Sequence, residues 1–235
     1  MYKSVTFGRL LSTYCCMWIF TAFALYCVPS ANLTFPATLW FQVFTYCSNL
    51  LIAWRGLRIS LKQVMNIYSK WSWWCLFPLL FLFIFLFKGD TYLNFTDTVE
   101  AVFFVALPEE MIFHCFFSPC LVQSLGKKKG IWMDSILFAA IHIPVLFFWD
   151  HLSLVEICGS LLYLTVVGAI YADQMYRTKS LSYLALLHGV GDVNFIPQSV
   201  KPIMLLIIIS LEIVISFLLS PDEEWRIESY SILHR

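Results

Sequence analysis

Six ionisable side chains lie inside stretches that are otherwise apolar, and their types are those that activate water or transfer protons. They occur in three stretches and are Glu109, Glu110, His114, His142, His188 and Asp192. An ionisable group inside a membrane span costs on the order of a few kcal/mol and usually marks function. Carboxylates and imidazoles are also the groups that general acid–base catalysis uses most often, so these residues are candidates for hydrolytic chemistry.

Their spacing places them on shared helix faces. Glu110 and His114 are four residues apart, as are His188 and Asp192, and residues at this spacing are neighbours on a helix. Glu109 lies about 100° around the helix from Glu110. One glutamate can therefore face a site while the other supports His114.

The composition indicates that these residues belong to a membrane protein. Of the 235 residues, 60% are hydrophobic and only 13% are charged, against about half and about a quarter in an ordinary soluble domain. The net charge is zero, so we predict no nucleic-acid partner. The eight cysteines show no regular spacing, and we interpret them as apolar side chains rather than as metal ligands.

Eight apolar runs approach the length of about 20 residues that a membrane span needs. We therefore predict an all-α, polytopic protein of about eight transmembrane helices that form a single domain, 1–235, in the lipid bilayer. The first run follows two basic residues, as in a signal peptide, but it is long, and we interpret it as a retained helix. The predicted spans are 10–29, 37–54, 71–87, 98–125, 131–149, 152–173, 180–196 and 202–220.

The predicted spans bring the ionisable groups to one depth. At about 1.5 Å per residue, Glu109 lies about 16 Å along the fourth span and His142 about 16 Å along the fifth. His188 and Asp192 lie about 12 and about 18 Å along the seventh. All four side chains are therefore expected near the middle of the bilayer, as a single site requires.

The basic residues predict how the chain is oriented. With eight spans, thirteen of the fifteen lysines and arginines fall on the side that both termini share, and only Lys88 and Lys201 fall on the other. Short loops that are rich in lysine and arginine stay in the cytosol. We predict that both termini are cytosolic, and we favour a bacterial cell membrane as the location.

Three motifs resemble those of the CAAX protease and bacteriocin-processing family. This family includes type II CAAX prenyl endopeptidases and lysostaphin-resistance-like bacterial proteins. The segments 109–114, 138–142 and 188–192 are similar in order and spacing to its EExxxR, FxxxH and HxxxN/D motifs. The resemblance covers residues 98–196, which we predict to be the catalytic core of an intramembrane endopeptidase.

The resemblance also implies a role for each catalytic residue. Glu109 would act as general base on a water held between it and His142. His188 and Asp192 would sit opposite and help to stabilise the tetrahedral oxyanion. The implied partner is a membrane-anchored peptide or protein substrate, and no cofactor is implied.

Glu110, His114 and Phe138 are expected to support the catalytic groups. His114 stands where the family usually has arginine, which is permanently charged, whereas a histidine can be neutral near pH 7. This departure concerns the support of Glu110 and the pH range of activity, and it touches neither Glu109 nor His142.

Two other chemistries use the same residues. Glu109, His142 and His188 could hold zinc as one carboxylate and two histidines, although the sequence has no HExxH motif. Residues 189–192 spell the GxGD motif of aspartyl intramembrane proteases. That chemistry needs a second aspartate inside the membrane, and we place the three candidates near predicted helix ends: Asp134, Asp150 and Asp173.

A membrane-bound immunity or transport protein with a decayed site is the non-enzymatic alternative, since transporters also place such groups at mid-membrane. For an enzyme, the sequence leaves the substrate open. A prenylated CAAX tail, a pheromone precursor, a bacteriocin leader and a C-terminal sorting anchor are all compatible with it.

Overall fold

The computed structural model describes residues 5–28, 35–69, 75–86, 91–192 and Ser210. Within these ranges the regular structure is helical, which confirms the all-α class, and Ser69 and Ser180 form one isolated bridge. The elements, with π-type turns labelled η, are α1 (Phe7–Cys27), α2 (Phe35–Leu57), α3 (Leu61–Tyr68), α4 (Leu76–Leu86), α5 (Thr91–Val99), η3 (Glu100–Ala106), α6 (Leu107–Glu110), η4 (Met111–Phe117), α7 (Ser118–Leu125), α8 (Lys127–Ile141), η5 (Val145–Trp149), α9 (Leu154–Thr178) and α10 (Leu181–Asp192).

Four helices in the described part of the chain are long and apolar enough to cross a membrane. They correspond to the predicted first, fourth, fifth and sixth spans, and many of their large apolar side chains are exposed. Exposed apolar surface of this extent needs lipid around it, so the protein is an integral membrane protein. The four helices are Phe7–Cys27, Phe95–Leu125, Lys127–Trp149 and Leu154–Thr178.

The other predicted spans are matched only in part. The second lies within α2, and the third and seventh overlap the shorter helices α4 and α10. The eighth, 202–220, lies outside the described residues except for Ser210. The count of about eight spans therefore stays a prediction.

Two boundaries differ from the sequence-based expectation. The stretch between the second and third predicted spans was expected to be a connection, but it contains α3, which buries Val64 and Tyr68. The helix that carries the two glutamates already begins at Thr91, and its apolar span at Phe95, rather than at residue 98. Polar residues at the start of that helix hide its beginning from a hydropathy count.

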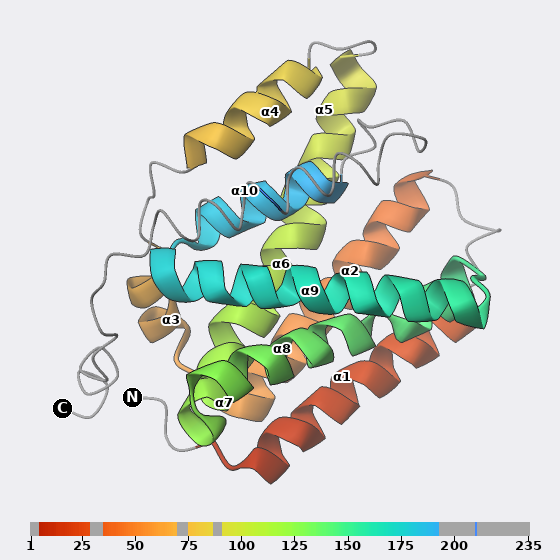
Figure 1. Ribbon diagram of the computed structural model, residues 1–235. Coiled ribbons are helices and arrows are strands. Elements are labelled where there is room, and N and C mark those ends of the chain that lie inside the picture. The colour runs from red at the N-terminus through yellow and green to blue at the C-terminus, as the bar shows by residue number, and fades with distance from the viewer. Residues whose placement is uncertain (1–4, 29–34, 70–74, 87–90, 193–209, 211–235) are drawn as a thin grey trace.

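The helix that contains α6 runs through the centre of the fold (Figure 1). α6 packs against α2 and α10, and the η4 turn that follows it contacts α8 and α9. α1 packs along α2 and also contacts α8. Helices that are distant in sequence thus surround the two glutamates of α6.

Two glycines and a capping box fix the helices that follow the α6 segment in the chain. Gly126 has φ 81° and turns the chain sharply between α7 and α8. A Cβ at Gly130 would lie 2.6 Å from the backbone of Val122, so only glycine allows these two helices to pack this closely. Ser153 and Glu156 form a capping box that starts α9.

Candidate active site

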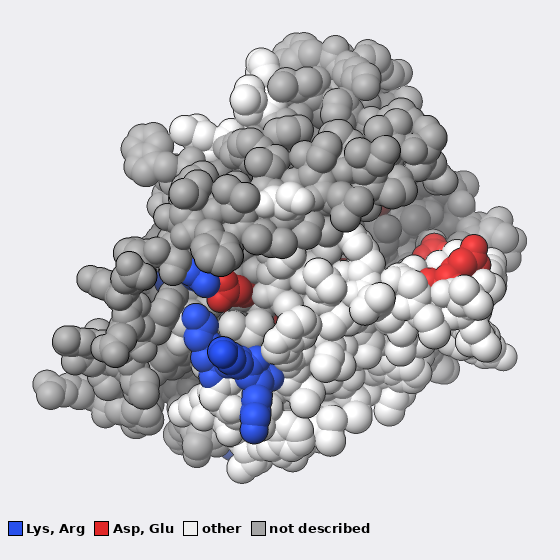
Figure 2. Space-filling view, viewed as in Figure 1, with Lys and Arg blue, Asp and Glu red and all other residues white. Residues whose placement is uncertain are grey.

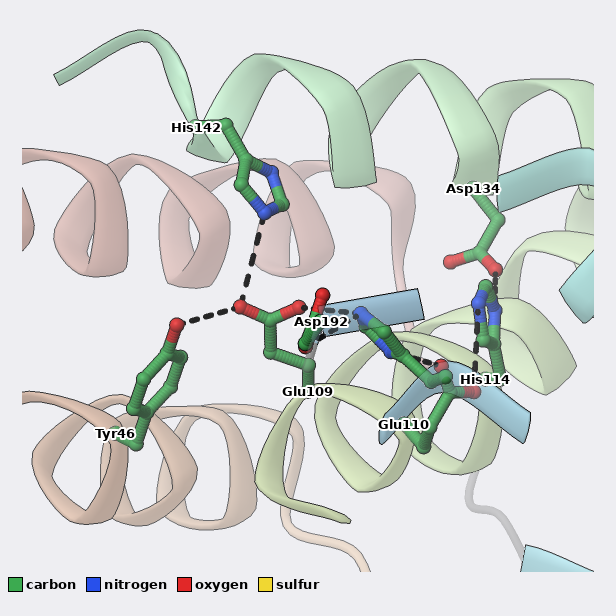
Figure 3. A network of polar contacts seen from close by, with 8 residues as sticks. Tyr46, Glu109, Glu110, His114, Asp134, His142 and Asp192 are labelled. Atoms are coloured by element: carbon green, nitrogen blue, oxygen red, sulfur yellow. Dashed lines mark hydrogen bonds and ion pairs between the residues drawn. The ribbon is translucent and has the colours of Figure 1, made fainter. Parts of the chain in front are cut away.

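Glu109 and Glu110 lie near the middle of the Phe95–Leu125 helix and are both buried, at 5% and 0% exposure. The π-type turns η3 and η4 flank the single turn that carries them, and such turns are frequent at functional sites. Pro108, which lacks an amide hydrogen, also interrupts the regular hydrogen-bond ladder here. The adjacent glutamates point to different neighbours, as their spacing predicted (Figure 3).

Glu109 lies between α2, α8 and α10. The hydroxyl of Tyr46 donates a hydrogen bond of 2.7 Å to its Oε1. The same oxygen is 3.7 Å from Nε2 of His142, and Oε2 is 3.8 Å from Nε2 of His188. Oε2 is buried and has no hydrogen-bond partner, so one carboxylate oxygen is held by a hydrogen bond and the other is not.

His142 ends α8, and its ring is held in one orientation. Nδ1 lies 2.7 Å from the carbonyl oxygen of Phe138, which can only accept, so Nδ1 carries the hydrogen. In the neutral ring Nε2 is then a bare acceptor directed at Glu109. The Phe138 ring packs edge-on against the imidazole at 5.0 Å, which explains in physical terms why the two residues are four positions apart.

His188 and Asp192 lie on the last turns of α10. Nδ1 of His188 donates to Oε1 of Glu110 at 2.8 Å, and its Nε2 is 3.5 Å from Oδ2 of Asp192. A side chain at Gly189 would overlap Val102, so a glycine is needed to bring α10 this close to η3. The structure therefore brings together Glu109, His142, His188 and Asp192, the four predicted catalytic residues.

Glu110 and His114 are neighbours, as predicted, but His114 has a closer partner. Nε2 of His114 is 3.7 Å from Oε2 of Glu110, whereas its Nδ1 is 2.7 Å from Oδ2 of Asp134. The interpretation of Asp134 as a helix-end residue is wrong. Asp134 lies on the second turn of α8, is fully buried, and belongs to the group that supports Glu110 (Figure 3).

Sequence reasoning missed two residues of this network, Tyr46 and Asp134. Asp134, Phe138 and His142 recur at four-residue intervals and therefore share one stripe of α8. That regular spacing is a signal from which Asp134 could have been found. Tyr46 carries no charge at neutral pH, and nothing in the sequence shows which face of α2 meets Glu109.

A cavity of about 110 Å³ opens beside Glu109 and His142. α1, α2, the end of α8 and η5 form its walls, and the stacked rings of Phe41 and Trp149 form part of them. The remaining lining residues are partly apolar and partly polar: Thr21, Leu25, Gln42, Thr45, Tyr46, Asn49, Ile141 and Val145. The cavity gives a reactant access to the glutamate–histidine pair.

The site chemistry does not by itself point to a metal. Among the described residues, no three His, Cys, Asp or Glu side chains form a set that could hold a metal ion. Three residues were considered as zinc ligands from the sequence. At the nearest atoms, Glu109 lies 3.7 Å from His142 and 3.8 Å from His188. A reaction without a metal stays a prediction.

The fold and the site define an all-helical integral membrane protein with a buried cluster of carboxylates and histidines beside a cavity. Residues 78–194 match the family described as type II CAAX prenyl endopeptidase Rce1-like. This match includes all three motifs, and the chain carries a domain of that family, as the motifs indicated. No curated protein and no solved structure matches the chain.

Proposed function

We propose that this protein is an intramembrane endopeptidase that hydrolyses a peptide bond of a membrane-associated protein or peptide. The observation that carries the proposal is the pair of Glu109 and His142 beside a cavity, within a segment that matches a family of membrane endopeptidases. The family description favours a substrate with a prenylated C-terminal cysteine motif.

In the proposed mechanism, Glu109 and His142 hold the attacking water. His142 uses Nδ1–H for the Phe138 carbonyl, so its Nε2 accepts a hydrogen bond. A water between Nε2 and the Glu109 carboxylate donates one hydrogen to each. Its oxygen lone pair is then directed at the substrate carbonyl carbon. Glu109 takes a proton as the bond to carbon forms, and it later gives that proton to the leaving amine as the C–N bond breaks.

The proposed oxyanion stabilisation comes from α10. Glu110 accepts from Nδ1 of His188, so His188 donates from Nε2 only when it is an imidazolium. The carboxylates of Glu110 and Asp192 on either side favour that cation. A charged donor directed at the developing negative charge lowers the barrier most when it is already in place.

Supporting contacts keep the donor and the base in position. Asp134 holds His114, and His114 lies beside Glu110. Tyr46 donates to Oε1 of Glu109 and holds the carboxylate beside Nε2 of His142. We propose that these three residues are positioning residues rather than catalytic ones.

The experiment that tests the function uses purified protein in lipid vesicles. The substrate is a fluorescence-quenched peptide that ends in a farnesylated cysteine and three further residues, and mass spectrometry identifies the cleaved bond. The wild type is expected to cleave it at one position, whereas Glu109→Ala is inactive. Equal cleavage by both proteins, or cleavage by neither, would overturn the proposal for this class of substrate.

We also propose that the reaction requires no metal, because Nε2 of His142 and the Glu109 carboxylate can hold a water and Glu109 can deprotonate it. Elemental analysis of the active protein tests this. Stoichiometric zinc whose removal abolishes activity, and whose return restores it, would contradict the proposal.

A further inference from the structure

The cavity wall formed by α2 has a hydrogen-bonding pattern that the mechanism above does not use. Gln42, Tyr46 and Asn49 recur at intervals of four and three residues, so they lie on one face of the helix. All three line the cavity beside Glu109. We call these three residues the α2 amide face, and they precede the segment that matches the family, 78–194.

The two amides of this face each have an oxygen that the protein leaves unpaired. The nitrogen of Asn49 donates to Oγ1 of Thr21 at 2.8 Å, and the side chain of Gln42 lies near the Glu100 carboxylate. Their oxygens, Oδ1 of Asn49 and Oε1 of Gln42, are buried without a hydrogen-bond partner. An unpaired buried acceptor is costly and is rare in native proteins.

The partner missing from this face is a hydrogen-bond donor. The Tyr46 hydroxyl already donates to Glu109, so what the face leaves unpaired are acceptors. The other walls include apolar side chains such as Leu25, Ile141 and Val145. Donors flanked by apolar groups are what an extended hydrophobic peptide presents through its backbone N–H groups, whereas a lipid tail presents none.

We propose that the α2 amide face binds the substrate as an extended peptide by accepting hydrogen bonds from its backbone N–H groups. This inference rests on the proposed function and deepens it. Gln42 and Asn49 are about 10 Å apart along α2, which is the length of about three extended residues. Tyr46 lies between them and contacts Glu109, so the carboxylate lies beside the middle of the bound segment.

The inference limits the class of substrate. In a helix most backbone N–H groups are already bonded to the chain itself, so an intact transmembrane helix presents no row of free donors. The substrate is therefore a segment that is extended or unwound where it is cut, such as a flexible tail next to a membrane anchor.

The test uses the quenched farnesylated peptide and a series in which an ester replaces one non-scissile amide at a time. Each ester removes one N–H group and needs no change in the protein. With wild-type protein, the ester at a contacting position is expected to raise KM about three- to tenfold with kcat unchanged, as for the loss of one neutral hydrogen bond.

Protein variants locate the contact. Asn49→Leu and Gln42→Leu are expected to raise KM for the all-amide peptide by a similar factor. Each should also lose the sensitivity to one ester position, because the partner of that N–H group has been removed. Asn66→Leu on α3 makes the same chemical change at an exposed position and serves as the control.

The possible results separate the two proposals. Wild-type cleavage with the same KM for every ester overturns the inference and leaves the proposed function intact. If no peptide is cleaved, the proposed function fails for these peptides, and fluorescence anisotropy then compares their binding. Weaker binding of a particular ester still supports the α2 amide face, whereas equal binding of all peptides, or no binding, overturns it.

Discussion

Glu109 and Glu110 are adjacent in sequence, but their contacts give them different tasks. Glu109 touches Tyr46 and faces two imidazoles and a cavity, so it is placed to act on a reactant. Glu110 has no exposed surface and links His188 to His114. Buried carboxylates persist only when they are paired in this way, and here the pairing also orients the imidazole of His188.

Tyr46→Phe tests whether the phenol orients the base. The change keeps the ring and removes the 2.7 Å hydrogen bond to Glu109. A hydrogen bond to a charged group contributes enough that kcat should fall about ten- to a hundredfold. KM should change little, because the bond positions Glu109 rather than the peptide. Steady-state kinetics on the quenched peptide measure both constants.

Tyr14→Phe is the matched control for that change. Tyr14 donates to the carbonyl of Leu137 at 3.0 Å, and no contact with Glu109 is seen. The kcat of the Tyr14→Phe variant should therefore stay close to that of the wild type. Equal losses of kcat in the two variants would show a general effect of removing a buried hydroxyl and would contradict the positioning role of Tyr46.

His114→Arg restores the residue that the family usually has. A guanidinium can pair with Asp134 and Glu110, the two carboxylates that His114 already contacts. A histidine loses its positive charge as pH rises past neutrality, whereas arginine keeps it. We expect an active variant whose pH–rate profile extends further to high pH, while His114→Ala loses activity. A His114→Arg protein that inserts normally but is inactive would show a direct role for His114.

The ionisable residues of the candidate site could be predicted from the sequence because charge is conspicuous in an apolar helix. Glu109, His142 and His188 stood out for this reason, and their common depth followed from helix geometry. Tyr46 gave no such signal. Asp134 was misjudged because distance from a helix end says nothing about burial between helices, and α8 also begins at Lys127 rather than at residue 131.

At the scale of the helices, close packing of α9 on α8 holds the aromatic centre of the site. A Cβ at Gly168 would lie 2.9 Å from the Phe138 ring, and this ring packs against both His142 and His188. The histidines therefore depend on a contact between two helices that carry neither Glu109 nor Glu110.

Gly168→Ala is expected to displace Phe138, to lower the stability by about 1–3 kcal/mol and to reduce kcat. Gly159→Ala is the control on the same helix, because a Cβ there meets nothing within 4 Å. Thermal unfolding in detergent and peptide cleavage measure the two effects. Equal melting temperatures and equal rates for the two variants would contradict the proposed role of this contact.

The helix boundaries show what hydropathy can and cannot predict. The apolar runs located α1, α8 and α9 well, because lipid selects for long apolar segments. α3 is short and amphipathic, and the first turns of α5 are polar, so neither produces an apolar run. Their positions depend on packing against other helices. A hydropathy average over neighbouring residues carries no information about that packing.

At the scale of the whole molecule, the basic residues in view concentrate at one end of the α8–α9 pair. Lysines and arginines gather near the α7–α8 turn, where an acidic patch lies beside them, and further acidic residues gather at the opposite end (Figure 2). The basic end includes Lys127–Lys129, and the acidic end includes Asp150 and Glu156. The surface between them is mostly uncharged in this view, as expected for a band that faces lipid.

This distribution agrees with the predicted orientation, which a reporter fusion can test. A fluorescent protein that folds only in the cytosol, fused to either terminus, is expected to fluoresce in both cases. The same reporter inserted at His151, between α8 and α9, should stay dark. Fluorescence from only one terminus would contradict an even number of spans.

The most direct test of the account compares Glu109→Gln with Asp192→Asn in the vesicle cleavage assay. If Glu109 is the base, Glu109→Gln should lose about 10²–10⁴-fold in rate. Asp192→Asn should keep substantial activity, because asparagine is nearly isosteric and has N–H donors of its own. In aspartyl chemistry Asp192 must exchange protons with water, which an amide cannot do. Near-complete loss in Asp192→Asn, with survival of activity in Glu109→Gln, would contradict the assignment of Glu109 as the base.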